Sequence, residues 1–247
     1  MGSFLLRFSL TVLLVWVMAA CGSGGAPGSD NAPSSDDSDG GGDDGTPPDP
    51  PAPPSPLNIV TPEQRTAYYD LLLPNFSTVN SSATTGAATP FAAPAVTGSV
   101  TYDGYMQLIM GNATIAANVI GTTSVQVSFD GGPVTGSAGN FLGVTPDEAM
   151  VRQVVAYEGT VDIFGGGVTE GQDGSTDISF QIDGALDNGV NTFAIDGTLV
   201  GGFYGSEAEG LYVIGSNTGV HGNINIAIDG ASGTGTLGIG TVSAIKP

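Results

Sequence analysis

The sequence predicts an all-β fold, an antiparallel and soluble β-barrel of about eight strands that follows a disordered linker and a short helix. From Ala95 onward, apolar and polar residues alternate, as they do on strands with one buried face. Turn signals separate the alternating runs, at Asp130-Gly131, Asp173-Gly174, Asp187-Asn188-Gly189 and Asp229-Gly230. Antiparallel strands must hide their apolar face in a sandwich or a closed barrel, and about 150 residues are enough to bury a core.

The first 20 residues are predicted to be a signal peptide. Arg7 precedes a short apolar run from Phe8 to Val17, and Ala19 and Ala20 precede Cys21. A basic start, a short apolar core and small residues before a cleavage point are typical of a secretory signal. The run is too short for a comfortable membrane-spanning helix.

Cys21 is the one cysteine of the sequence, so no disulfide can form within the chain. Its position after two small residues resembles a bacterial lipobox, although Met18 stands where Leu is usual. The resemblance implies cleavage before Cys21 and attachment of acyl chains, palmitate among them. With Gly22 next to the cysteine, it also implies a lipid anchor in the outer membrane, on the periplasmic or the surface side. An ordinary signal peptide with a coincidental cysteine is the alternative.

Residues 21–56 are predicted to be a disordered Gly/Asp/Pro linker, because they contain almost nothing to bury. The proline-rich section from Thr46 to Pro56 should extend over about 30 Å at roughly 3 Å per residue. Asp36 to Gly45 lacks the spaced ligands and the closing Glu of a calcium loop, so we interpret it as an acidic spacer.

Residues 57–94 are predicted to hold a short helix and a loose segment. Thr61 can cap the helix, Pro62 suits its first position, and Gln64 completes a capping box. The apolar run that follows is expected to stop at Pro74. From Asn80 the chain is rich in Ser, Thr, Ala and Pro, which predicts the loose segment.

Residues 95–247 are predicted to be the β-barrel domain. The triplet Ile-Asp-Gly recurs at 182–184, 195–197 and 228–230, and we interpret it as a strand that ends in a turn. The three glycines from Gly165 to Gly167 are interpreted as a flexible turn. Predicted strands cover Ser99–Met110, Ala113–Asn118, Ser124–Phe129, Val134–Phe141, Val155–Phe164, Thr176–Leu186, Asn191–Leu199 and Asn223–Ile228, with short additions at Leu211–Ile214 and Gly235–Ile239.

The charge of the chain is strongly negative. It contains four Lys and Arg residues against 24 Asp and Glu, for a formal net charge of −20. Such a surface repels phosphate backbones, which proteins bind through Lys and Arg, so nucleic acid is excluded as a partner. High charge of one sign also keeps chains apart in solution. Basic proteins and cations remain as partners.

One stretch carries a family resemblance. Residues 202–210, Gly-Phe-Tyr-Gly-Ser-Glu-Ala-Glu-Gly, resemble the Gly-x-Phe-Tyr-Gly-Pro-x-Ala-x-Glu signature of the transferrin-binding protein B β-barrel domain, with Ser206 in place of the proline. Residues 127–137 resemble a hairpin of that domain, and residues 98–105 resemble its first strand. The resemblance spans about residues 98–246 and implies a surface lipoprotein with a single barrel that binds another protein, often to acquire iron.

Binding is expected in the loops of the barrel, because loops on a rigid scaffold often carry recognition. The predicted loops are Gly143–Val154, with the cation Arg152, and Gly165–Ser175. Phe203 is expected in the core. Tyr204 is expected at the rim, where packing and ligand contact are both open interpretations.

Catalysis, cofactors and metals are not expected. His221 is the sole histidine, no Gly-x-Ser-x-Gly elbow accompanies it, and structural zinc sites need several His or Cys ligands. The expected function is therefore a non-catalytic, membrane-anchored lipoprotein that binds an extracellular protein or a small solute, including a role in iron acquisition. A structural envelope lipoprotein without a specific ligand is the alternative.

Overall fold

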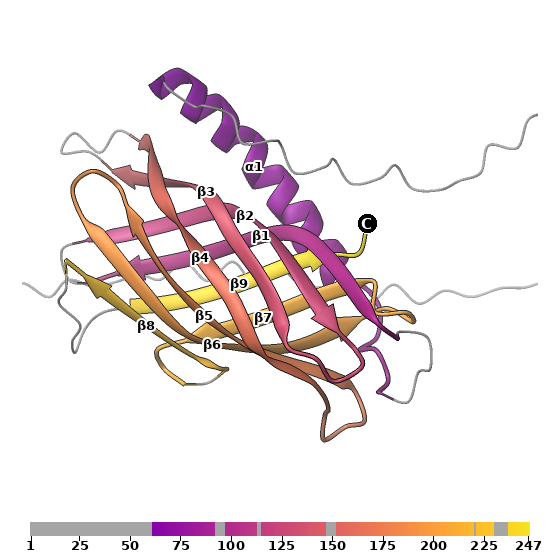
Figure 1. Ribbon diagram of the computed structural model, residues 1–247. Coiled ribbons are helices and arrows are strands. Elements are labelled where there is room, and N and C mark those ends of the chain that lie inside the picture. The colour runs from indigo at the N-terminus through magenta and orange to yellow at the C-terminus, as the bar shows by residue number, and fades with distance from the viewer. Residues whose placement is uncertain (1–60, 92–96, 113–114, 147–151, 220, 230–236) are drawn as a thin grey trace, which may run out of the picture. The chain divides into compact units, whose positions relative to one another are not determined.

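The computed structural model describes residues 61–91, 97–112, 115–146, 152–219, 221–229 and 237–247. The predicted signal peptide, Cys21 and the linker lie outside these residues. The described chain consists of one helix followed by nine strands (Figure 1). Their bounds are α1 Pro62–Ala83, β1 Ser99–Gly111, β2 Ala116–Ser128, β3 Val134–Pro146, β4 Arg152–Glu170, β5 Thr176–Asp187, β6 Thr192–Tyr204, β7 Gly210–Ser216, β8 Asn223–Ile228 and β9 Leu237–Ile245.

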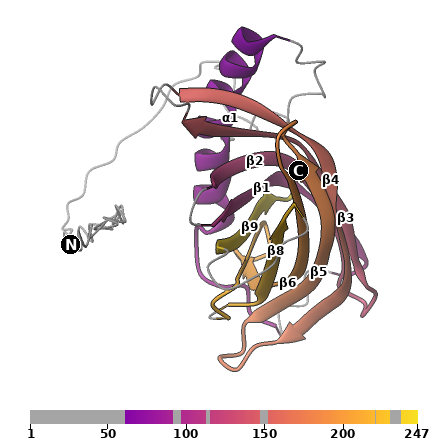
Figure 2. The same ribbon diagram turned by 90° about the vertical axis from the view of Figure 1, so that its left-hand side faces the viewer.

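The strands close into a barrel, which confirms the predicted fold class. Neighbouring strands pair antiparallel in the order β1-β2-β3-β4-β5-β6-β7-β9, and β9 returns to β1. Eight strands therefore form a closed ring, whose curvature is visible in Figure 2. The first half of β6 pairs with β8 and its second half pairs with β7, so β8 continues the line of β7.

Glycines make the bulges that bend the long strand β4. The predicted turn at Gly165–Gly167 is wrong, because these residues lie inside β4, where its register against β5 shifts. Gly165 and Gly166 have φ of +68° and +63°, a conformation that suits glycine and marks a bulge. The predicted strand ended at Phe164 because a glycine run resembles a turn until its partner strand is known.

The Ile-Asp-Gly triplets were predicted to be turns, and two of them are not. Residues 182–184 lie within β5, residues 195–197 lie within β6, and the two triplets pair with each other. Their aspartates, Asp183 and Asp196, are directly opposite. Asp162 on β4 is directly opposite Asp183 as well. Three exposed carboxylates therefore lie in one row on neighbouring strands of the outer face. We call Asp162, Asp183 and Asp196 the aspartate row.

The aspartate row should weaken the fold, because like charges directly opposite each other on neighbouring strands repel. Replacing the central Asp183 with Asn is expected to raise the free energy of unfolding by roughly 0.5 kcal/mol. Since salt screens exposed charges, the gain should shrink at 1 M NaCl, where the Debye length is about 3 Å. Urea unfolding at low and high salt measures both effects. Asp130→Asn, in the β2–β3 turn, is the control and should change stability little; equal gains from both variants would contradict the prediction.

The interior of the barrel is a single apolar core. Alternate residues of the strands point inward, and large side chains such as Tyr102, Phe141, Phe180, Phe193 and Phe203 are fully buried there. The predicted core position of Phe203 is confirmed.

Helix α1 begins where the sequence predicts but runs much further. Thr61 is its N-cap, and the capping box with Gln64 is present. Pro74 does not stop the helix, which continues to Ala83. A proline inside a helix removes one backbone hydrogen bond and crowds the preceding turn. Burial of residues on both sides of Pro74 offsets that cost.

The buried stripe of α1 packs on the outer wall of the barrel. Tyr69, Leu72, Phe76 and Val79 recur at intervals of three and four residues, the spacing of one helix face. They cover outward-facing residues of β1 to β4 and β9, and Figure 2 shows the helix lying along this side of the barrel. The Ser243 hydroxyl of β9 donates to the Asn80 side-chain oxygen at 2.7 Å, which fixes the end of the helix. Within the described part of the chain, no helix is both long and apolar enough to cross a membrane.

Replacing Pro74 with Ala is expected to raise the free energy of unfolding by about 1–3 kcal/mol. Alanine restores the missing N–H and is the best helix former, whereas proline costs about 3 kcal/mol in a helix interior. Thermal unfolding followed by circular dichroism measures the change. Ser77→Ala, at an exposed position of the same helix, provides a control for general helix propensity. An unchanged or lower melting temperature for the Pro74 variant would show that α1 is built around the proline.

The segment after α1 was predicted to be loose, but hydrogen bonds hold residues 87–90 against the barrel. The Thr89 N–H donates to the Phe203 carbonyl at 2.9 Å, and the Thr176 N–H donates to the Thr89 carbonyl at 2.7 Å. The Thr89 hydroxyl also donates to the Gly205 carbonyl at 2.7 Å. Residues 87–90 therefore lie between the end of β6 and the start of β5, where these two strands separate.

Candidate functional site

A groove of about 630 Å³ lies in the outer wall of the barrel, over β5, β6 and β7. The register of these strands places its residues. Asp177 of β5 is opposite Gly202 of β6, which is opposite Tyr212 of β7. The next outward row along the strands is Ser179, Val200 and Ile214. The groove therefore has side chains at its sides and a glycine in its floor.

Gly202 keeps the floor open. A Cβ built at this position would have only the Thr176 carbonyl oxygen, at 3.2 Å, as a close contact, and the space beyond it belongs to the groove. A larger side chain here would fill the volume that a ligand would occupy.

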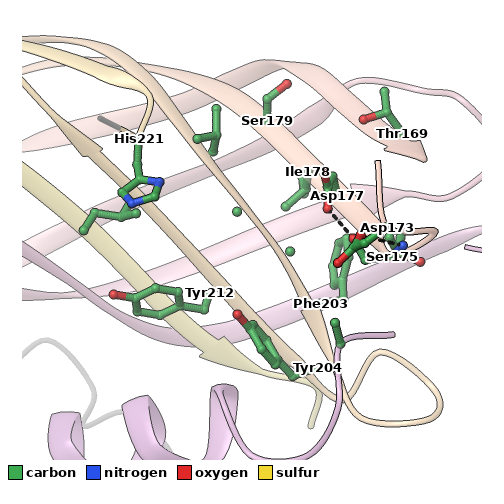
Figure 3. A pocket seen from close by; sticks show the side chains of 16 residues that line it. Thr169, Asp173, Ser175, Asp177, Ile178, Ser179, Phe203, Tyr204, Tyr212 and His221 are labelled. Carbon is green, nitrogen blue, oxygen red and sulfur yellow. Dashed lines mark hydrogen bonds between the residues drawn. The ribbon is translucent and has the colours of Figure 1, made fainter. Parts of the chain in front are cut away.

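Two tyrosines form the aromatic wall of the groove. Tyr204 and Tyr212 are half-buried and lie side by side at one edge in Figure 3. Burial raises the pKa of the Tyr212 phenol, and the neighbouring Tyr204 raises it further. The hydroxyl therefore remains protonated at neutral pH and can donate a hydrogen bond.

Aspartates form the opposite rim. The Ser175 hydroxyl donates to the Asp177 carboxylate at 2.8 Å, and the Ser175 backbone N–H donates to the Asp173 carboxylate at 3.1 Å (Figure 3). Hydrogen bonds from Ser175 lower the pKa of Asp173, so its carboxylate is charged at neutral pH. His221, from the loop between β7 and β8, is exposed at a third side. Neither Lys nor Arg occurs among the described residues that line the groove.

Ala88, from the hydrogen-bonded segment of residues 87–90, closes one end of the groove. It pairs with Tyr204 as an isolated β-bridge, and Pro90 pairs with Ser175 in the same way. This segment therefore positions one residue of the aromatic wall and one of the acidic rim.

A second, smaller hollow of about 300 Å³ lies between α1 and the bulged part of β3 and β4. Tyr68 and Tyr157 line it, and their buried hydroxyls have no hydrogen-bond partner among the described residues. The two rings also belong to the packing of the helix and of the core. The larger groove, whose polar groups face an open volume, is the candidate site.

The structure separates the two binding residues predicted from the sequence. Tyr204 lies in the groove. Arg152 is the first residue of β4 and pairs with Pro146, at the end of the barrel opposite to the β6–β7 turn. The side chain of Arg152 lies outside the described part of the structure, as does Cys21. Arg152 and Tyr204 therefore do not share a site.

The predicted binding loops are also largely wrong. The flanks of Gly143–Val154 belong to β3 and β4, and residues 147–151 lie outside the described residues. Most of Gly165–Ser175 belongs to β4. Only its last part reaches the groove, through Thr169, Asp173 and Ser175.

Sequence reasoning missed Asp177, Gly202 and Tyr212. Each occupies an outward position of its strand, which the alternation pattern could identify. The pattern could not show that the three positions are directly opposite, because strand register comes from the paired structure. Among the described residues, no group of three or more His, Cys, Asp or Glu is placed to hold a metal ion.

Comparisons of this chain with protein-family models, with curated proteins and with solved structures found no match. The interpretation of the groove therefore depends on its own geometry and chemistry.

Proposed function

We propose that this protein is a non-catalytic lipoprotein, anchored to the outer membrane through Cys21, that binds its ligand in the groove over β5, β6 and β7. The observation that supports binding is the combination of an aromatic wall, a charged acidic rim and an open glycine floor in one hollow of about 630 Å³. That volume is in the usual range for ligand pockets. Aromatic faces with a few placed polar groups are the usual chemistry of recognition.

The anchor explains how such a site would meet its ligand. A lipid on Cys21 would hold the chain at the membrane, and residues 22–56 would supply the reach. Mass spectrometry of the mature protein should find acyl chains on the Cys21 sulfur, and Cys21→Ser should release the protein from the membrane fraction. An unmodified Cys21 thiol would contradict the anchor while leaving the groove to be tested separately.

Cross-linking in cells tests the groove. A photoreactive amino acid replaces Val200 in the full-length protein, and another replaces Gln126, an exposed outward residue of β2. We expect a discrete cross-linked species from position 200 alone. Adding Gly202→Leu, which fills the groove, should remove that species.

The cross-linking experiment is repeated in cells grown with and without iron limitation. It shows whether ligand binding serves iron acquisition, as the family resemblance implies. A cross-link that appears only under iron limitation would support that role. Identical products from positions 200 and 126, or none from position 200 in either medium, would contradict binding in the groove.

A further inference from the structure

The aspartate row lies on the same outer face as the groove. Asp177 and Asp183 both point outward from β5, and β5 pairs with β6 without a register shift between them. They are six residues apart, which corresponds to roughly 20 Å along a strand. We call the groove together with Asp162, Asp183 and Asp196 the acidic face.

Among the described residues, β5, β6 and β7, which carry most of the acidic face, contain neither Lys nor Arg. Of the Lys and Arg residues in the described chain, Arg65 lies on α1, Lys246 follows β9, and Arg152 begins β4, ten residues before Asp162. The described partner of the row is neutral, since the Asn225 amide donates to the Asp196 carboxylate at 3.0 Å. Three opposed carboxylates are unfavourable for folding, and local departures from favourable design often mark functional sites.

We propose that the acidic face docks on a basic surface of a partner protein. This inference rests on the proposed function of the groove and names its ligand class. An Arg or Lys side chain of the partner enters the groove, where it meets the Asp177 carboxylate and the faces of Tyr204 and Tyr212. Further cations of the partner lie over the aspartate row.

The chemistry of the groove fits a cation. A guanidinium or ammonium group is attracted both by carboxylates and by aromatic faces, and arginine also stacks on aromatic rings. An anionic ligand would face two carboxylates at the rim without a Lys or Arg among the described lining residues. Nucleic acids and anionic lipid surfaces are repelled for the same reason.

The size of the acidic face favours a protein over a small cation. A small molecule could occupy the groove, but it could not span the distance from Asp177 to Asp183, roughly 20 Å along β5. Complementary charge over such a distance accelerates encounter between proteins and sets their orientation.

A pair of peptides tests the inference on the full mature chain. The probe is a fluorescent 16-residue peptide with Arg at every fourth position among Gly and Ser, and its neutral match has citrulline in place of Arg. Fluorescence anisotropy gives Kd at 50 mM and 500 mM salt. We expect the Arg peptide to bind at least tenfold more tightly than the citrulline peptide at low salt, and to lose most of that advantage at high salt.

Variants distinguish the effect of the acidic face on peptide binding from the effect of net charge. Asp177→Asn should weaken binding of the Arg peptide about fivefold. The triple change of Asp162, Asp183 and Asp196 to Asn should weaken binding and reduce its salt dependence. The control changes Asp36, Asp37 and Asp39 of the linker to Asn, which alters net charge equally and should have little effect. Equal weakening by the two triple variants would overturn the inference, because net charge alone would then explain binding.

Two further outcomes distinguish a wrong ligand class from a groove that binds no ligand. If the Arg and citrulline peptides bind equally and Gly202→Leu blocks both, the groove binds ligands but the preference for a basic partner is wrong. If neither peptide binds, the inference is overturned. The cross-link from position 200 then decides the proposed function independently.

Discussion

Replacing Phe203 with Ala is expected to lower the free energy of unfolding by about 3–5 kcal/mol, the usual cost of removing a buried phenylalanine ring. Phe203 is fully buried near the end of β6. Its ring centroid lies 5.6 Å from that of Tyr102 and 5.1 Å from that of Phe129, so the change removes two aromatic contacts and leaves a cavity.

The loss of packing in Phe203→Ala should also weaken the β6–β7 turn. The Tyr102 hydroxyl donates to the Ala208 carbonyl at 2.8 Å, and the Phe203 carbonyl accepts the N–H of Thr89. Chemical unfolding followed by circular dichroism measures the stability. Phe164→Ala is the control, since Phe164 is 41 % exposed on the outer face and its removal should cost less than about 1 kcal/mol. Similar losses for the two variants would contradict the assignment of Phe203 to the core.

The adjacent glycines Gly201 and Gly202 should respond in opposite ways to alanine. At Gly201 an added Cβ would overlap the Tyr212 carbonyl oxygen and the Val213 Cα, which are backbone atoms of β7 and cannot move without separating the strands. We expect Gly201→Ala to cost about 3 kcal/mol, at the upper end of the range for overpacking. At Gly202 the added methyl group enters the groove, and the expected change is about 0.5 kcal/mol or less.

The two glycine variants also check the substitution used to block the groove. If Gly202→Ala preserves stability, a loss of cross-linking in Gly202→Leu reports on the groove rather than on folding. Thermal unfolding of both alanine variants provides the measurement. A larger loss at Gly202 than at Gly201 would contradict the inward and outward assignment of β6.

The sequence predicted what depends on local chemistry. The capping box at Thr61 marks the start of α1, and β8 has the same bounds in the prediction and in the structure. Turns after Phe129, at Asp173-Gly174 and at Asp187–Gly189 are also confirmed, with positive φ at Gly131, Gly174 and Gly189.

What the sequence could not predict depends on contacts between distant residues. Pro74 lies within α1 because residues beyond it, such as Phe76 and Val79, are buried against the barrel. Two strands were predicted at Ala113–Asn118 and Ser124–Phe129, but the structure has one strand, β2, in which Gly121 lacks a side chain and accommodates the Phe141 ring. In both cases tertiary packing outweighs the local signal.

The candidate site depended still more on strand pairing. Tyr204 could be placed at the rim from its neighbours in the sequence, but its partners Asp177 and Tyr212 come from other strands. The same limit applied to the aspartate row, because the Ile-Asp-Gly triplets indicated turns until β5 and β6 were seen to pair through them.

Methyl NMR tests recognition by the outer wall most directly. Val200 and Ile214 are opposite each other in the groove, whereas Ile120 and Val154 are buried beneath α1. Titration with the arginine peptide should shift the methyl signals of Val200 and Ile214 saturably, leave those of Ile120 and Val154 in place, and produce no shifts in Gly202→Leu. Saturable shifts that spare Val200 and Ile214, or no saturable shift at any methyl group, would contradict binding of a basic partner in the groove.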